Sequence, residues 1–139
     1  MSNNPQVTAA SIGAPYAVTL KDHIGHQWLA DEPLAAGGGN EGPGPHALLL
    51  SSLGACTAIT LRMYAACKSW ALTGVEVEVA FNPDGAPADG ANEIRRRITL
   101  HGDLDAEQRA RLLEVANKCP IHRVLTGAVR IPTTLSHHE

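Results

Sequence analysis

The sequence predicts an α+β fold in which a long central helix packs against antiparallel sheets. Two pairs of short stretches alternate apolar and polar residues, one long apolar stretch has helical length, and the elements follow the order ββ, long α, ββ, α, short α, β. That order lacks the regular strand–helix alternation of a doubly wound sheet. At 139 residues, the chain fits a single domain, 1–139, that buries about two thirds of its unfolded surface without disulfide support.

The N-terminal part of the chain predicts a β-hairpin followed by a loop. Residues 16–22 alternate apolar and polar side chains, and residues 24–30 fit an antiparallel partner across the turn at Asp22-His23. Glycine and proline dominate residues 31–45, so no regular element is expected there. The glycine run in this segment lacks the Lys-Ser/Thr ending of a phosphate-binding loop, which leaves a flexible loop as the prediction.

A long helix is predicted from Pro45, a residue that suits a first helical turn, to about Ser69. Such a helix is about 36 Å long. Apolar side chains lie on nearly every side of it, so we expect a second copy of the chain to cover what one chain leaves exposed. The stretch is interrupted by polar residues, which favours a core helix over a membrane span: Ser51, Ser52, Thr57, Thr60 and Arg62.

A second hairpin is predicted from residues 75–81 and 94–100, which alternate with period two around a turn rich in glycine and proline. The outward positions carry opposite charges that are expected to pair across the hairpin: Glu76, Glu78, Arg95 and Arg97. Arg96 is the exception. Its place in the alternation puts its guanidinium on the apolar face of the hairpin, where it could donate hydrogen bonds toward the interior.

The C-terminal part predicts two helices and a last strand. Asp103 or Asp105 caps a helix that continues to about Asn117, and a short helix follows Cys119-Pro120 up to about Thr126. Residues 128–135 are predicted as an edge strand, since Pro132 is tolerated only at a sheet edge.

Composition excludes several classes of function. The chain has 11 basic and 14 acidic residues, a formal net charge of −3, and 4% aromatic residues, so it offers neither a basic footprint nor a stacking surface for nucleic acid. The first residues contain no basic and apolar signal sequence, and the odd number of cysteines fits free thiols in a reducing compartment. We therefore expect a cytoplasmic protein with no membrane or nucleic-acid partner.

Two cysteines carry the strongest chemical signal. Cys119 precedes a Pro-started helix whose N-terminal dipole favours an anion, and basic side chains follow and precede it in sequence. Cys56 lies about three turns inside the long helix, so its activation would have to come from side chains that the fold brings to it. Taken alone, Cys56 also fits a small buried hydrophobic residue, and Cys67 is predicted to serve packing.

Alternative chemistries remain open for the same residues. Cys119 and His122 form a Cys-x-x-His pair that could ligate zinc with Cys56 as a third ligand, although the other half of a zinc motif is missing. A catalytic Cys–His nucleophile is a further alternative.

Five motifs in this order closely resemble the OsmC/Ohr family, from about residue 16 to residue 135. They are Asp31-Glu32-Pro33, Gly38-Gly39, the run from Gly42 to Ala58, Leu61-Arg62-Met63-Tyr64-Ala65, and Lys118-Cys119-Pro120-Ile121-His122-Arg123. The resemblance implies an intertwined homodimer with two central helices and active sites at the subunit interface. It also implies a hydroperoxide reductase of oxidative or osmotic stress defence, acting on organic hydroperoxides and on hydrogen peroxide, with no cofactor or metal. In that chemistry Cys56 becomes a sulfenic acid, Cys119 resolves it to a disulfide, and an external thiol or dithiol reduces the disulfide.

The sequence departs from the family pattern beside the first cysteine. Peroxidases of this family place an arginine in the loop before the long helix and a glutamate near its start, whereas here the loop has no arginine and His46 stands at about the glutamate position. We expect Arg62, Arg96 or Arg123 from either subunit to replace the charge, with Arg123 first, and His46 to take the positioning role. The departure leaves open a redox-sensing or ligand-binding dimer of weak activity.

Overall fold

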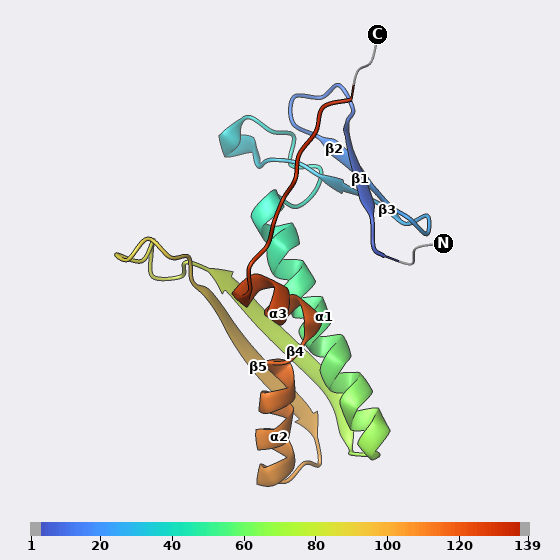
Figure 1. Cartoon of the computed structure of the whole chain (residues 1–139), viewed down its shortest axis with the longest axis vertical. Coiled ribbons are helices and arrows are strands. Elements are labelled where there is room, and N and C mark those ends of the chain that lie inside the picture. Colours follow the sequence, from blue (N-terminus) through green and yellow to red (C-terminus); the bar gives the residue numbers. More distant parts are fainter. Residues whose placement is uncertain (1–3, 137–139) are drawn as a thin grey trace. The chain divides into compact units, whose positions relative to one another are not determined.

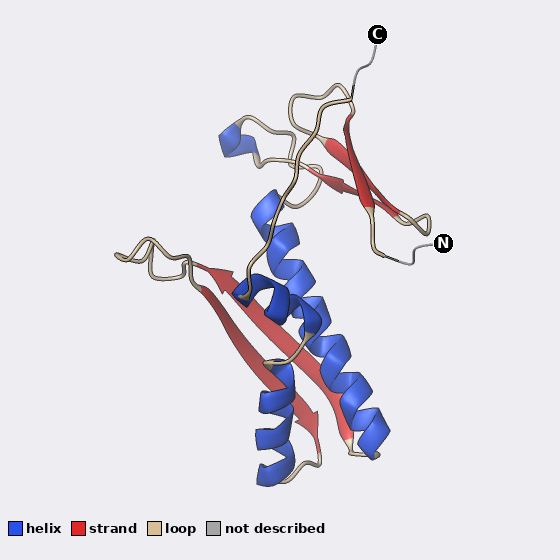
Figure 2. Ribbon diagram, viewed as in Figure 1, coloured by secondary structure: helices blue, strands red, loops and turns tan. Residues whose placement is uncertain are grey.

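The computed structural model describes residues 4–136, and the chain divides after Ser51 into two compact units. The elements, in chain order, are β1 (Val7–Ser11), β2 (Val18–Asp22), β3 (Gln27–Ala30), the 3₁₀ helix η1 (Leu34–Ala36), α1 (Pro45–Lys68), β4 (Leu72–Phe81), β5 (Ile94–Gly102), α2 (Ala106–Ala116) and α3 (Pro120–Thr126). Figures 1 and 2 show these helices and strands. The predicted α+β class is confirmed, whereas the single domain over 1–139 stays a prediction.

The N-terminal unit is a three-stranded antiparallel sheet in the order β1-β2-β3. The predicted hairpin is confirmed, with Leu20 opposite Trp28. The turn is anchored by the Asp22 carboxylate, which accepts hydrogen bonds from the backbone N–H groups of Ile24 and His26. Strand β1 was not predicted, because its residues are exposed throughout and show no apolar alternation.

The glycine-rich segment that follows is ordered by one buried carboxylate. Asp31 is 3% exposed and accepts hydrogen bonds from the backbone N–H groups of Glu32, Gly39 and Glu41. These bonds replace the regular backbone pairing that the segment lacks. The prediction of no regular element is corrected by η1, which ends at Gly37 in the left-handed conformation (φ 89°) that glycine adopts without strain.

The β4–β5 hairpin forms the sheet of the C-terminal unit, with the predicted alternation of half-buried and exposed residues. The predicted pair between Glu78 and Arg97 is confirmed, at 2.7 Å. The expected cross-hairpin pairing does not extend to Glu76 and Arg95, because the register places Thr99 opposite Glu76 and Ala80 opposite Arg95. The Arg95 guanidinium instead bonds to acidic residues at the turn, Asp84 and Glu93.

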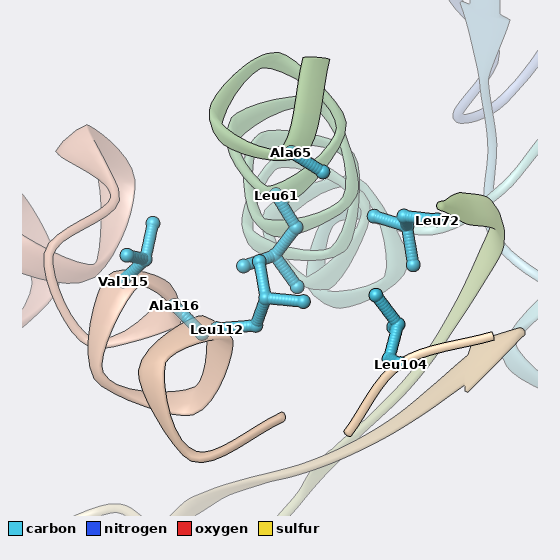
Figure 3. Close-up of a cluster of buried hydrophobic side chains, with 7 residues drawn as sticks. All are labelled: Leu61, Ala65, Leu72, Leu104, Leu112, Val115 and Ala116. Carbon is cyan, nitrogen blue, oxygen red and sulfur yellow. The ribbon is translucent and has the colours of Figure 1, made fainter. Parts of the chain in front are cut away.

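The core of this unit lies between α1, α2 and the ends of the hairpin. In Figure 3 the side chains of Leu61 from α1 and Leu112 from α2 point toward one another, and both are fully buried. The cluster consists of Leu61, Ala65, Leu72, Leu104, Leu112, Val115 and Ala116. Of the two predicted caps, Asp105 begins α2 through a reciprocal capping box with Gln108.

Helix α1 has the predicted bounds and buries one narrow stripe. Its buried residues follow a spacing of four: Leu53, Thr57, Leu61 and Ala65. Other apolar side chains stay exposed, including Ile59 at 58% and Met63 at 68%. Within residues 4–136, α1 is the one helix whose length and hydropathy would suffice to cross a membrane, a test that core helices of globular proteins also pass.

The predicted last strand is wrong for the single chain. Residues 128–135 adopt no regular secondary structure, and β4 and β5 pair only with each other. Pro132 offers no N–H to a neighbour, and the flanking Ile131 is 81% exposed. The segment therefore has apolar alternation but no partner strand in the part of the chain described here.

Candidate active site

The fold brings Cys56 and Cys119 together within the C-terminal unit. Cys119 caps α3 and is fully buried, whereas Cys56 on α1 is partly exposed. The Cys56 thiol hydrogen-bonds to Cys119, and the hydroxyl of the adjacent Thr57 lies 3.8 Å from Cys119 Sγ. Two thiols far apart in sequence thus share one site.

Arg96 reaches this site from β5, as its inward parity predicted. Its Nη1 lies 3.0 Å from Thr57 Oγ1, 3.2 Å from the Ala116 carbonyl oxygen and 4.0 Å from Cys119 Sγ. Its Nη2 lies 2.9 Å from Asn117 Oδ1 and 3.1 Å from His122 Nδ1. These contacts span α1, the end of α2 and the start of α3, so they hold the guanidinium in one position beside the buried sulfur.

The surroundings of Cys119 favour its thiolate. Burial raises the pKa of Cys119, whereas the hydrogen bond from the backbone N–H of His122 and the contacts with Thr57 and the Cys56 thiol lower it. Together with the positive charge of Arg96, these interactions leave the pKa below its ordinary value. The contacts of the buried sulfur thus favour its anionic form.

His122 serves this network as a neutral imidazole. Burial lowers the pKa of His122, and the positive charge of Arg96 lowers it further. Because the guanidinium can only donate, the 3.1 Å contact requires His122 Nδ1 to accept. The backbone N–H of the same residue points at Cys119 Sγ, 3.4 Å away.

The other predicted site residues lie elsewhere. Arg62 donates a hydrogen bond to the Leu72 carbonyl at 2.9 Å, and Arg123 is exposed on α3. In the single chain, Arg96 rather than Arg123 supplies the guanidinium beside Cys119. His46 is the exposed second residue of α1, and its positioning role stays a prediction. Cys67 is exposed, contrary to the packing role predicted for it.

Thr57 and Asn117 were not recognised from the sequence. Thr57 is fully buried and accepts from Arg96 while its hydroxyl also donates to the Leu53 carbonyl. A signal was present, because Thr57 is the polar member of a stripe that is otherwise apolar at a spacing of four. Asn117 carried no such signal, since a polar residue after a helix is ordinary.

A cavity of about 250 Å³ borders the Arg96 network. Its apolar part consists of Leu53, Ile94, Ile98 and Leu113, and its polar part of Arg96, Asn117 and His122. The cavity is thus suited to a small molecule with an apolar body.

The zinc alternative finds no support in the site. No group of three His, Cys, Asp or Glu side chains within residues 4–136 is arranged to hold a metal ion. The guanidinium of Arg96 also faces His122 Nδ1, where a cation would be repelled.

Comparison with known proteins identifies the family. A sequence model described as OsmC-like protein matches residues 37–134, more than two thirds of the chain and including both site cysteines. No curated protein sequence matched.

Three solved structures illustrate the shared fold. An OsmC-like protein from Mycoplasma pneumoniae is 24% identical, with a TM-score of 0.73, and the alignment covers 91% of this chain and 90% of that one. OhrB of Bacillus subtilis, an organic hydroperoxide resistance protein, is 23% identical (TM-score 0.59, covering 89% and 91%). The organic hydroperoxide resistance protein OsmC from Legionella pneumophila is 18% identical (TM-score 0.63, covering 89% and 90%). By the match to the family and by its α+β fold, this chain belongs to the OsmC-like protein family.

Proposed function

We propose that the protein is a thiol-dependent peroxidase that reduces organic hydroperoxides, and also hydrogen peroxide, in stress defence. The observation that carries the proposal is the meeting of two thiols, the buried one beside a fixed guanidinium, next to a mainly apolar cavity. Two of the structural relatives are organic hydroperoxide resistance proteins, which supports the same activity.

In the first step Cys56 attacks the peroxide, because its partly exposed sulfur is the accessible one. The Cys56 thiol passes its proton to the Cys119 thiolate, to which it is hydrogen-bonded. The resulting Cys56 thiolate forms a bond to the terminal oxygen, the O–O bond breaks, and the alkoxide leaves with the proton from Cys119 as an alcohol. Cys56 is now a sulfenic acid, oxidised by two electrons, and Cys119 is again a thiolate.

In the second step Cys119 Sγ attacks Cys56 Sγ. The S–S bond forms, the S–O bond breaks, and hydroxide takes a proton from solvent to leave as water. A thiol or dithiol then reduces the disulfide and returns both cysteines to the starting state. Regeneration of the free thiols in this way needs a reducing compartment such as the cytoplasm.

We propose further that the protein works as a homodimer. Exposed apolar residues on α1, including Leu49 at 40%, Ile59 at 58% and Met63 at 68%, leave the helix incompletely covered in one chain. A second copy that covers α1 would remove this surface from water.

The expected result is a dimer in sedimentation velocity at micromolar concentration, and Ile59→Glu should shift the population toward monomer because it places a charge in the covered face. The matched control is Ile24→Glu, at the exposed tip of the β2–β3 turn (70% exposed), which should leave the dimer intact. A wild-type monomer at these concentrations would refute the proposal.

The peroxidase itself is tested by steady-state removal of cumene hydroperoxide with a dithiol as reductant. We expect multiple turnovers, and, without reductant, the loss of two thiols per chain with a Cys56–Cys119 disulfide in the peptide mass spectrum. Stoichiometric oxidation without turnover would favour a redox sensor, and three free thiols after peroxide would refute both functions.

A further inference from the structure

We infer that Arg96 makes Cys119, and not Cys56, the sulfur that is anionic in the reduced protein, and that a reductant therefore attacks Cys56 and expels Cys119. The second half of this inference rests on the proposed peroxidase cycle. Arg96 is thereby a positioning residue for the resolving cysteine.

The donors of the site are distributed unequally between the two sulfurs. The donors that face Cys119 Sγ are the backbone N–H of His122 at 3.4 Å and Arg96 Nη1 at 4.0 Å, whereas the Thr57 hydroxyl, 3.8 Å away, donates its hydrogen to the Leu53 carbonyl. In the described part of the chain, the polar contacts of Cys56 are Thr60 Oγ1 at 3.9 Å and Cys119 itself. An anion is consequently stabilised at Cys119 Sγ more than at Cys56 Sγ.

Arg96 cannot readily turn toward Cys56, because both of its terminal nitrogens are held. The Ala116 carbonyl and Asn117 Oδ1 accept from the guanidinium on the side of α2, and Thr57 Oγ1 accepts on the side of α1. These acceptors fix the positive charge against the buried sulfur independently of the redox state of Cys56.

Titratable and charged groups from three elements, α1, β5 and α3, surround Cys119. The titratable and charged groups that face it within residues 4–136 are Cys56 from α1, Arg96 from β5 and His122 from α3. His122 accepts from Arg96 through Nδ1, so it is neutral. Arg96 is the permanent positive charge of the site.

The direction of reduction follows from charge and exposure together. A thiolate of the reductant reaches the partly exposed Cys56 Sγ, whereas Cys119 is 0% exposed. As the new S–S bond forms, the old one breaks and its electron pair goes to Cys119 Sγ, which leaves as a thiolate beside Arg96. A better-stabilised thiolate leaves faster. The second thiol of a dithiol then releases Cys56 as a thiolate, which takes a proton, and the reductant ends as a cyclic disulfide.

The assignment of the anion is tested by titrating thiolate absorbance near 240 nm in a Cys67→Ser background, without peroxide. We expect the thiolate that forms at lowest pH to persist in Cys56→Ser and to disappear in Cys119→Ser. Arg96→Met should raise the midpoint pH of this thiolate step by about one unit or more, and Arg96→Lys should restore part of the shift. Arg97→Gln, which changes the exposed neighbour paired with Glu78, should leave the midpoint unchanged.

A lowest-pH thiolate step that disappears in Cys56→Ser and persists in Cys119→Ser would overturn the inference. These two variants decide it even where Arg96→Met fails to fold.

The direction of attack is tested on protein oxidised with diamide and treated with excess glutathione, followed by acid quenching and peptide mass spectrometry. We expect the glutathione adduct on Cys56, and an adduct confined to Cys119 would overturn the second half of the inference. Because neither measurement uses a hydroperoxide, absence of peroxide turnover would refute the proposed function and leave the assignment of the anion standing.

Discussion

Replacing Cys56 by serine is expected to lower the rate of hydroperoxide consumption by about 10²-fold or more, essentially to background. The reason is that Cys56 is the partly exposed sulfur of the pair, and a serine hydroxyl is far less nucleophilic than a thiolate. The measurement is the initial rate of cumene hydroperoxide loss with a dithiol reductant.

Cys67→Ser is the matched control, since Cys67 lies on the same helix and is exposed away from the site; its rate should equal that of the wild type. Cys119→Ser should allow one oxidation per chain and accumulate a sulfenic acid on Cys56, detected as a dimedone adduct. Full turnover by Cys56→Ser would move the attack to Cys119 and contradict the proposed order of steps.

Replacing Leu112 by alanine is expected to lower the free energy of unfolding by about 2–5 kcal/mol, the cost typical of a Leu→Ala change in a well-packed core. Leu112 is 0% exposed and packs against Leu61 in the cluster of Figure 3. Urea unfolding followed by circular dichroism measures the change.

The neighbouring Leu113 supplies the control for this variant. It is 59% exposed, so Leu113→Ala should change the free energy of unfolding by only about 0.5 kcal/mol. Equal losses in the two variants would show that the burial of Leu112 does not support α2. Because Ala116 at the end of α2 accepts a hydrogen bond from Arg96, loosening of the helix should also raise the pKa of Cys119.

The local sequence pattern was sufficient to predict most helices and strands of the fold. The β4–β5 hairpin, the bounds of α1 and the cap at Asp105 follow from alternation, proline placement and capping chemistry, all of which act within a few residues. Strand β1 was missed because its five residues are exposed and unpatterned. The strand predicted at 128–135 failed for the opposite reason, since alternation cannot form a strand without a neighbour to pair with.

The site was only partly predictable. The two cysteines were found from their motifs, and the parity of Arg96 in its strand indicated that the guanidinium points inward. Thr57 and Asn117 were not found, and Arg123 was preferred to Arg96 because it stands next to the Cys119 motif in sequence. Within the single chain the contact to Cys119 Sγ comes instead from a strand that precedes it by two elements, and the role of Arg123 stays a prediction.

By itself the sequence determined the α+β class, the long apolar helix, the pair of thiols and the inward direction of one arginine, because these follow from periodicity and residue chemistry over short stretches. Only the tertiary structure decided which sulfur is buried beside hydrogen-bond donors and which guanidinium stands next to it. The pKa of a thiol depends on burial, hydrogen bonds and charge within a few ångströms, and α1, β5 and the α2–α3 junction supply these from distant parts of the chain.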